Sequence, residues 1–149
     1  MGDEDTGLGT RLRRLLELLD DDLERVYAEI TPGYRPRFTP VMKALRHGPL
    51  TIKAIAGMSG VSHSAASQTV SRMVADGWVA YQVGDDARER LIRFTDTGKA
   101  ALPILEAQWA RTDRAAQALE AEIAAPLSAV ISAAIRALEN RPFRDRIRL

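Results

Sequence analysis

Hydrophobic residues recur at helical spacing from Leu8 to Ile30. They stand three or four positions apart, which is the period of one face of an α-helix, and acids and arginines fill the positions between them. Pro32 and Gly33 follow, and such a pair ends a helix. The pattern therefore predicts a long amphipathic helix, preceded by about seven flexible residues. Its apolar positions are Leu8, Leu12, Leu15, Leu16, Leu19, Leu23, Val26, Tyr27 and Ile30.

The middle of the chain predicts three helices separated by short breaks. Thr51 is suited to cap the second of these helices and Ser62 the third, and Gly60 turns the chain between them. Two helices joined by such a tight turn form a helix-turn-helix. The predicted ranges are 40–47, 52–59 and 63–76, with Ala66, Val70 and Met73 on the inner side of the third helix.

After Gly77 the pattern changes from helix to strand. Residues 78–83 are rich in strand-forming side chains, residues 84–87 are typical of a turn, and residues 88–94 alternate loosely between apolar and polar. This segment predicts a β-hairpin with a charged tip. Thr95 then caps a long helix, and Pro126 begins the last one.

These elements predict a mainly α fold with a small β-hairpin wing. A winged helix-turn-helix stands between N- and C-terminal helices that carry wide apolar stripes. We expect a dimerisation helix over residues 1–36, the winged helix over 37–95, further dimerisation helices over 96–140 and a basic tail over 141–149. The stripes favour burial against a second copy of the chain, although an intramolecular bundle would also cover them.

Charge is distributed unevenly along the 149 residues. Residues 1–30 carry nine acids and four bases, residues 31–75 carry six bases and no acid, and residues 76–149 carry eleven of each. An acid-free basic stretch is a candidate footprint for a polyanion. The first ten residues lack the plan of a signal peptide and no apolar run is long enough to cross a membrane, so we expect a cytoplasmic protein without a membrane partner.

The third central helix has an outer face suited to double-stranded DNA. Short polar side chains allow close approach to the major groove, Gln68 can pair with adenine, and Arg72 can reach guanine or phosphate. Arg88 and Arg90 at the hairpin tip are suited to the DNA backbone or minor groove. The candidate DNA-binding residues are Thr51, Ser62, His63, Ser64, Ser67, Gln68, Ser71, Arg72, Arg88 and Arg90.

The chain resembles the MarR family of winged-helix transcriptional regulators from Leu8 to Leu138. The motifs that carry the resemblance are Gly48-Pro49-Leu50-Thr51, the run from Ile55 to Ser62, the run from Ser67 to Val79, Asp86-Ala87-Arg88 in the wing, and Phe94-Thr95-Asp96-Thr97-Gly98 after it. Three positions depart from the family pattern. Ser59 stands where the family usually has leucine, Gln68 where many relatives have arginine, and Trp78 where an aliphatic residue is usual.

The resemblance implies a homodimeric, ligand-responsive repressor or activator. In similar proteins small aromatic acids bind in the crevice between the dimer helices and the winged domain. The residues here that could hold such an aromatic or anionic effector are Tyr27, Tyr34, Arg35, Arg37, Phe38 and Trp109. The alternative interpretation places Tyr27 and Trp109 in the core and Arg35 and Arg37 against phosphate.

Enzyme chemistry is not indicated by the sequence. Without cysteine there is no thiol nucleophile, disulfide or thiolate-bound zinc, and His47 and His63 lack the spacing of metal ligands. Residues 57–61 lack the second glycine of a nucleophile elbow, and no glycine-rich phosphate loop is present. We therefore expect no catalytic residue, metal or cofactor. The main alternative function is a winged helix that binds protein instead of DNA, whose mark would be an acidic or apolar outer face on residues 62–76.

Overall fold

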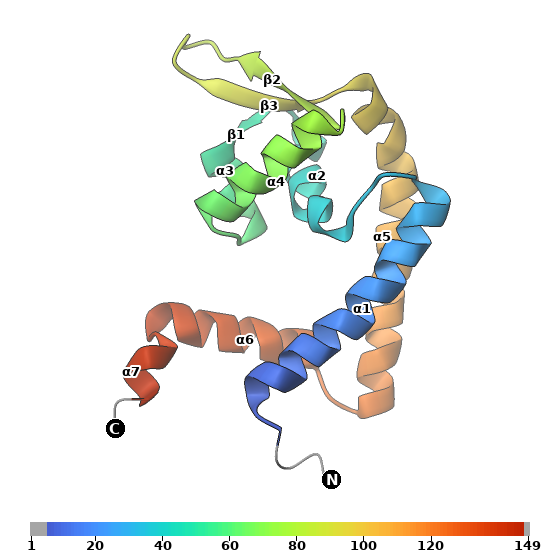
Figure 1. The fold of residues 1–149 in the computed structure, drawn as a ribbon, viewed down its shortest axis with the longest axis vertical. Helices are drawn as coiled ribbons and strands as arrows, with labels where there is room; N and C mark the ends of the chain where they lie inside the picture. Colours follow the sequence, from blue (N-terminus) through green and yellow to red (C-terminus); the bar gives the residue numbers. More distant parts are fainter. Residues whose placement is uncertain (1–5, 148–149) are drawn as a thin grey trace. The chain divides into compact units, whose positions relative to one another are not determined.

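The computed structural model describes residues 6–147, and it has the predicted fold class (Figure 1). The first five residues of the segment expected to be flexible lie outside the described range, as does Arg148 of the expected basic tail. The elements in order are α1 (Leu8–Ile30), the 3-10 helix η2 (Pro36–Phe38), α2 (Thr39–Ala44), the 3-10 helix η3 (Leu45–His47), β1 (Leu50–Thr51), α3 (Ile52–Ser59), α4 (His63–Ala75), β2 (Val79–Val83), β3 (Arg90–Phe94), α5 (Asp96–Ile123), α6 (Leu127–Asn140) and α7 (Phe143–Ile147).

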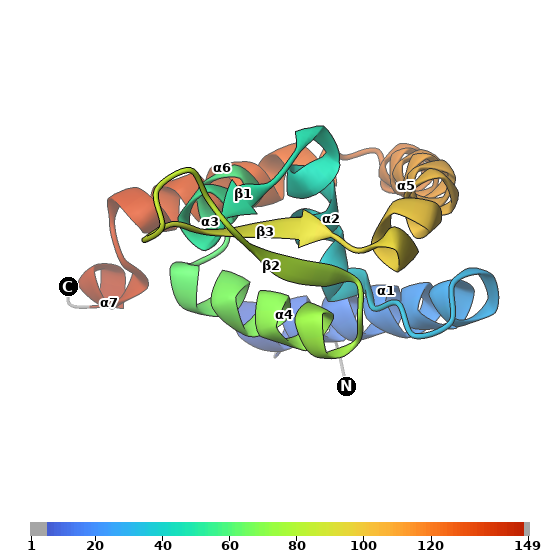
Figure 2. The same cartoon turned by 90° about the horizontal axis from the view of Figure 1, so that it is seen from above.

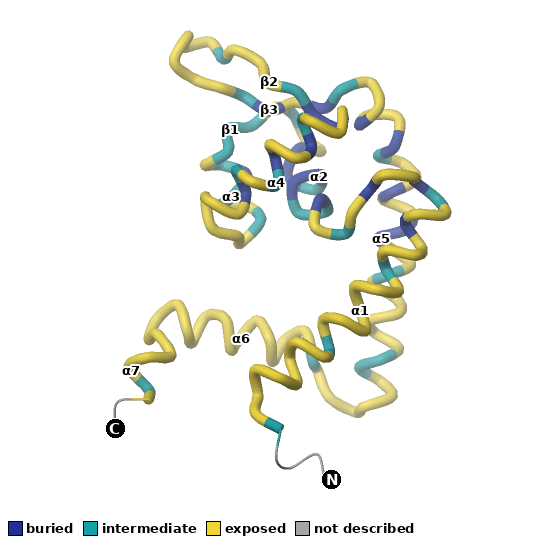
Figure 3. The backbone as a smooth tube through the Cα atoms, in the orientation of Figure 1, coloured by how far each residue is buried: buried dark blue, intermediate teal, exposed yellow. Residues whose placement is uncertain are grey.

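The chain forms two compact units, Met1–Glu106 and Ala107–Leu149, whose boundary falls inside α5. The first unit contains the winged helix and its core. Buried side chains gather where α2, α3, α4 and β3 face one another (Figure 3). Ala66, Val70 and Met73 of α4 are all buried, as their spacing predicts. The largest fully buried side chains here include Phe38, Met42, Leu45, Ile55 and Ile92.

Side-chain caps fix both helices of the helix-turn-helix. The Thr51 hydroxyl accepts a hydrogen bond from the amide of Ala54 at 3.1 Å, and the Ser62 hydroxyl accepts one from the amide of Ala65 at 3.1 Å. Between the helices Gly60 has a φ of 67°, a left-handed conformation that glycine adopts without strain. The predicted boundaries of α3 and α4 are therefore confirmed together with their physical cause.

The wing belongs to a three-stranded antiparallel sheet in the order β1-β3-β2 (Figure 2). Leu50 pairs with Ile92 and Thr51 with Leu91, so β3 lies between the other two strands. Sequence patterning missed β1, because a two-residue strand is too short to show alternation. The second strand of the hairpin, β3, begins at Arg90 and not at the expected Arg88. Arg88 belongs to the turn, where its backbone amide donates to the Asp86 carboxylate at 3.0 Å.

The start of α5 is bonded to the two residues that precede β2, the first strand of the wing. The Thr95 hydroxyl donates to the Gly77 carbonyl at 2.6 Å and accepts from the Gly98 amide at 3.1 Å. The Thr95 amide donates to the Trp78 carbonyl at 3.1 Å. A Cβ atom on Gly98 would overlap that same carbonyl oxygen, so only glycine fits at this contact.

In the second unit, α5 and α6 are joined by a tight corner. The Glu120 carboxylate accepts a hydrogen bond from the amide of Ser128 at 2.6 Å, at the first turn of α6. This hydrogen bond lowers the pKa of Glu120, because it stabilises the charged carboxylate. Pro126 is the N-cap residue directly before α6, close to the predicted start, and Ala124 at the corner has a φ of 52°.

The C-terminal segment is not only a basic tail. Residues Phe143–Ile147 form α7, and Arg146 donates to the carbonyls of Ala137 at 2.9 Å and Arg141 at 3.3 Å. These carbonyls lie at the C-terminal end of α6, and that of Ala137 also accepts from the Arg141 amide at 3.0 Å. The arginine therefore folds the segment back on α6, which a count of charges could not predict.

Candidate nucleic-acid interface

The outer face of α4 presents the polar side chains that the sequence places there. Ser64, Gln68 and Ser71 are exposed, while Ser67 is half-buried. They lie on the side of the helix opposite Ala66, Val70 and Met73, which are packed into the core. Packing of that inner side fixes the rotation of α4 and therefore fixes which side chains face outward.

Arg72 is exposed but already has a partner. Its Nε donates to the Asp76 carboxylate at 3.1 Å, one helical turn further on. The sequence interpretation treated this face as free of acids, and the structure corrects that view by adding Asp76 at its C-terminal edge. Half of the Arg72 side-chain surface is exposed (51%), and such pairs contribute at most about 1 kcal/mol. A phosphate can therefore compete with Asp76 for the guanidinium.

Thr51 and Ser62 stand at the N-terminal ends of α3 and α4. Each hydroxyl accepts a backbone hydrogen bond as a cap, which leaves its own hydrogen able to donate to a phosphate oxygen. His63 is exposed at the first residue of α4. Each cap thus combines a structural role with a hydroxyl group that can also donate.

The wing carries Arg88 and Arg90, both exposed, near the turn that joins β2 to β3 (Figure 1). The Arg90 guanidinium lies 4.4 Å from the centre of the Tyr81 ring. Tyr81 pairs directly with Ile92, so Arg90 is its diagonal neighbour on the same face of the hairpin. Sequence reasoning did not single out Tyr81, and the signal that could have found it was the strand register.

The six predicted effector residues fall into three environments. Tyr27, Tyr34 and Phe38 are buried in one aromatic cluster. The ring of Tyr34 lies 4.7 Å from that of Tyr27, 5.8 Å from that of Phe38 and 5.7 Å from that of Trp78, and its hydroxyl is 2.7 Å from the Thr39 hydroxyl. Arg35 and Arg37 are exposed, and Trp109 is buried in the second unit. Their role in ligand binding stays a prediction.

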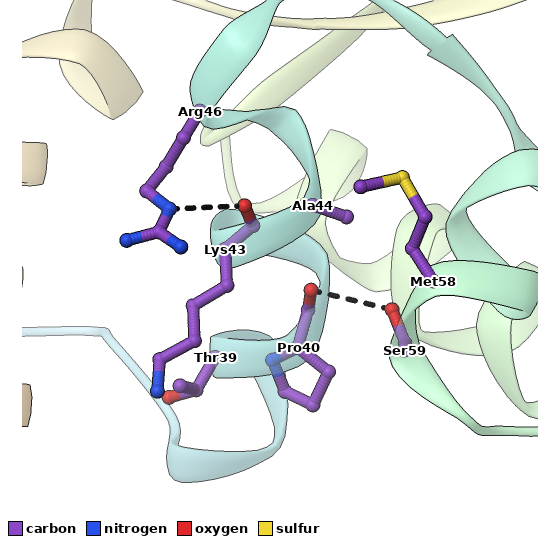
Figure 4. Close-up of a pocket in the computed structure, with 7 residues that line it drawn as sticks. All are labelled: Thr39, Pro40, Lys43, Ala44, Arg46, Met58 and Ser59. Atoms are coloured by element: carbon purple, nitrogen blue, oxygen red, sulfur yellow. Dashed lines mark hydrogen bonds between the residues drawn. The ribbon is translucent and has the colours of Figure 1, made fainter.

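A pocket of about 380 Å³ lies between α2 and the end of α3 (Figure 4). Lys43 extends from α2 and Arg46 from η3, and Met58 and Ser59 come from α3 (Figure 4). None of the six predicted effector residues is among its described lining residues, which are Thr39, Pro40, Lys43, Ala44, Arg46, Met58 and Ser59.

Residues 6–147 offer neither a cluster of metal ligands nor a single helix suited to a membrane. In that range, no group of three or more histidine, aspartate or glutamate side chains is arranged to hold a metal ion. Nor does any single described helix have the length and apolar character to cross a membrane. α5 and α6 reach that length and composition only together, across a bend of 95°.

Comparison with known proteins identifies the winged helix. Residues 41–89, from α2 through the turn of the wing, match the model of the MarR family. The match covers about a third of the chain, and within it the winged helix is similar to the MarR family. No curated protein sequence matches the chain.

Solved structures of MarR-family and other transcriptional regulators share the fold over most of this chain. The regulator MOSR of M. tuberculosis, in complex with DNA, is 21% identical with a TM-score of 0.72, and the match covers 93% of this chain and 100% of that one. The repressor CouR, bound to a 23-mer DNA duplex, is 20% identical with a TM-score of 0.68, covering 89% and 95%. PcaV from Streptomyces coelicolor, with its natural ligand, is 24% identical with a TM-score of 0.64, covering 95% and 97%.

Proposed function

We propose that this protein is a transcriptional repressor that binds a pseudo-palindromic DNA operator as a homodimer and whose activity responds to a ligand. The observation that carries the proposal is the outer face of α4, with its short polar side chains and Gln68, beside a wing that carries Arg88 and Arg90. MOSR and CouR, which share the fold, have been solved with DNA, and this supports the same use here.

The direct test is a selection of bound duplexes from a random pool, using the full chain. We expect enrichment of one sequence with two related half-sites, because a symmetric dimer presents two copies of α4. If no sequence is enriched, the winged helix instead serves as a protein-interaction module, the main alternative function.

Gln68 is expected to read a base. Gln68→Ala should weaken binding to the selected operator by roughly 1–3 kcal/mol and relax preference at one or two base pairs, because a bidentate contact to adenine is lost. Folding should be unchanged, since the side chain is exposed. Binding titrations against the operator, its single-base variants and a scrambled duplex measure this. An equal loss on all duplexes would show that Gln68 contacts only the backbone.

The wing arginines are expected to supply affinity without sequence preference. Arg90→Ala should weaken binding to every duplex and reduce the slope of log affinity against log salt by about one unit, because one phosphate contact is lost. Arg88→Ala should behave alike. Arg93→Ala is the matched control: it removes the same charge from β3, but Arg93 lies on the other face of the hairpin and donates to the Phe94 carbonyl at 3.0 Å. An equal effect of Arg93→Ala would assign the change to net charge alone.

The homodimer is supported by apolar side chains that the single chain leaves uncovered. In α1, Leu8, Leu16 and Leu18 are more than half exposed, and Tyr27 is its one buried residue. α6, which the structure describes in full, has no buried residue, although its apolar positions follow helical spacing (Figure 3). These positions include Val130, Ile131, Ile135 and Leu138. Such stripes favour burial against a second copy.

A ligand response is supported by the similarity to PcaV, which was solved with its natural ligand. The exposed Arg35 and Arg37, which precede the aromatic cluster of Tyr27, Tyr34 and Phe38, remain the sequence-based proposal for an anionic or aromatic effector. Aromatic rings already packed edge to face leave little room for a further ring, so a ligand at that place would have to displace core contacts.

A further inference from the structure

We infer that the pocket between α2 and the end of α3 binds a small organic anion, a carboxylate or phosphate joined to an apolar body. Its volume of about 380 Å³ lies within the range of small-molecule sites. Its lining combines two basic side chains, Lys43 and Arg46, with the apolar surfaces of Pro40, Ala44 and Met58. Neither the predicted DNA-binding residues nor the predicted effector residues include any of these.

The basic side chains favour an anion over a neutral ligand. Arg46 uses its Nε to donate to the Lys43 carbonyl at 3.2 Å, which orients the guanidinium and leaves its two terminal nitrogens to bind oxygen atoms (Figure 4). The sequence has no acid from residue 31 to residue 75, so the pocket lies within a segment that supplies no carboxylate of its own. An external anion would complement this charge.

The apolar wall favours a ligand with a hydrophobic body. Met58 is 62% exposed, and Pro40 and Ala44 line the same pocket. A flexible thioether adapts well to the surface of a bound ring or alkyl chain. The ligand would therefore be held by charge at the basic side chains and by contact at Met58.

Ser59 contributes a small side chain to the pocket lining. It stands where the MarR family usually has leucine, and its small side chain lines the pocket while donating to the Pro40 carbonyl at 3.3 Å. Leucine at this position would carry two additional heavy atoms into the same space. The departure from the family pattern thus coincides with the opening between the two helices.

Position in the fold couples the pocket to α4. Ser59 is the last residue of α3, directly before the left-handed Gly60 and close to the Ser62 cap of α4. A ligand that touches both α2 and Ser59 contacts the residue directly before the turn that joins α3 to α4, so it can favour one orientation of α4 over another. This regulatory consequence rests on the proposed function, whereas ligand binding itself does not.

The test is an NMR titration of the full chain with benzoate and with phenyl phosphate. The methyl resonances of Met58 and Ala44 report binding, and benzyl alcohol is the neutral control. We expect saturable shifts with at least one of the anions and binding roughly tenfold weaker for the alcohol. A tighter complex with phenyl phosphate would identify a phosphate ligand, and one with benzoate a carboxylate. Absence of saturation with both anions would overturn the inference.

Two variants locate the site. Ser59→Leu should fill the pocket and abolish the shifts while leaving the melting temperature within a few degrees of wild type. Arg46→Gln, at an exposed position, should weaken anion binding roughly tenfold and leave benzyl alcohol unaffected. If Ser59→Leu unfolds the protein, the Arg46→Gln variant still tests the inference. Unchanged anion binding in Arg46→Gln would place the ligand elsewhere. None of these readouts uses DNA, so failure here is distinguishable from failure of the proposed function.

Discussion

Gly98→Ala is expected to destabilise the protein by about 3 kcal/mol, the upper end for over-packing of a closely fitted site. The added methyl group would overlap the Trp78 carbonyl oxygen. That oxygen cannot move away freely, because it also accepts from the Thr95 amide at 3.1 Å and from the Thr95 hydroxyl at 3.1 Å. Thermal or denaturant unfolding at one fixed protein concentration measures the loss.

The matched control is Gly57→Ala in α3. This glycine is exposed, and a Cβ atom there would meet no atom within 4 Å. The same chemical change should therefore stabilise the protein by about 0.5–1 kcal/mol, because alanine is the better helix former. Similar stability changes in the two variants would contradict the assigned contact between Gly98 and Trp78.

Ile135→Glu is expected to raise the dissociation constant of the proposed homodimer roughly a hundredfold, because it places a carboxylate within an apolar interface. Ile135 is 52% exposed in the single chain and belongs to the apolar stripe of α6. Sedimentation over a range of concentrations measures the shift from dimer to monomer. Operator binding should fall in parallel, because one copy of α4 reads only one half-site.

Ala129→Glu is the control for this change. It introduces the same side chain into α6, on the opposite side of the helix from the stripe of Val130, Ile131 and Ile135. We expect this variant to remain dimeric. Wild-type sedimentation as a well-folded monomer at micromolar concentration would reject the dimer altogether, and equal dissociation of both variants would reject α6 as its interface.

Long elements with strong local signals could be predicted from the sequence. α1 begins and ends at the expected Leu8 and Ile30, because its apolar positions repeat over six turns and Pro32 follows. The limits of α3 and α4 follow from Thr51, Ser62 and the glycines, since a cap acts within its own helical turn. The outer face of α4 follows from the same periodicity.

Features that depend on pairing between distant residues could not be predicted. β1 exists because Leu50 and Thr51 meet Ile92 and Leu91, about forty positions later, and two residues carry no alternation of their own. The contact between Tyr81 and Arg90 depends on strand register, and α7 depends on Arg146 reaching carbonyls of α6. The α2–α3 pocket arises from the packing of two helices, which periodicity does not describe.

The order of strands in the sheet makes the base of the wing more rigid than its tip. At its base β3 is bonded on both edges, to β1 at Leu91 and Ile92 and to β2 throughout. Beyond Leu91 only the ribbon of Val83 and Arg90 remains, and an isolated two-stranded ribbon is marginally stable in water. Amide hydrogens should therefore exchange slowly at Ile92 and quickly at Arg90. The wing would bend at Leu91, adjusting its arginines to the width of a groove while the base keeps its alignment with α4.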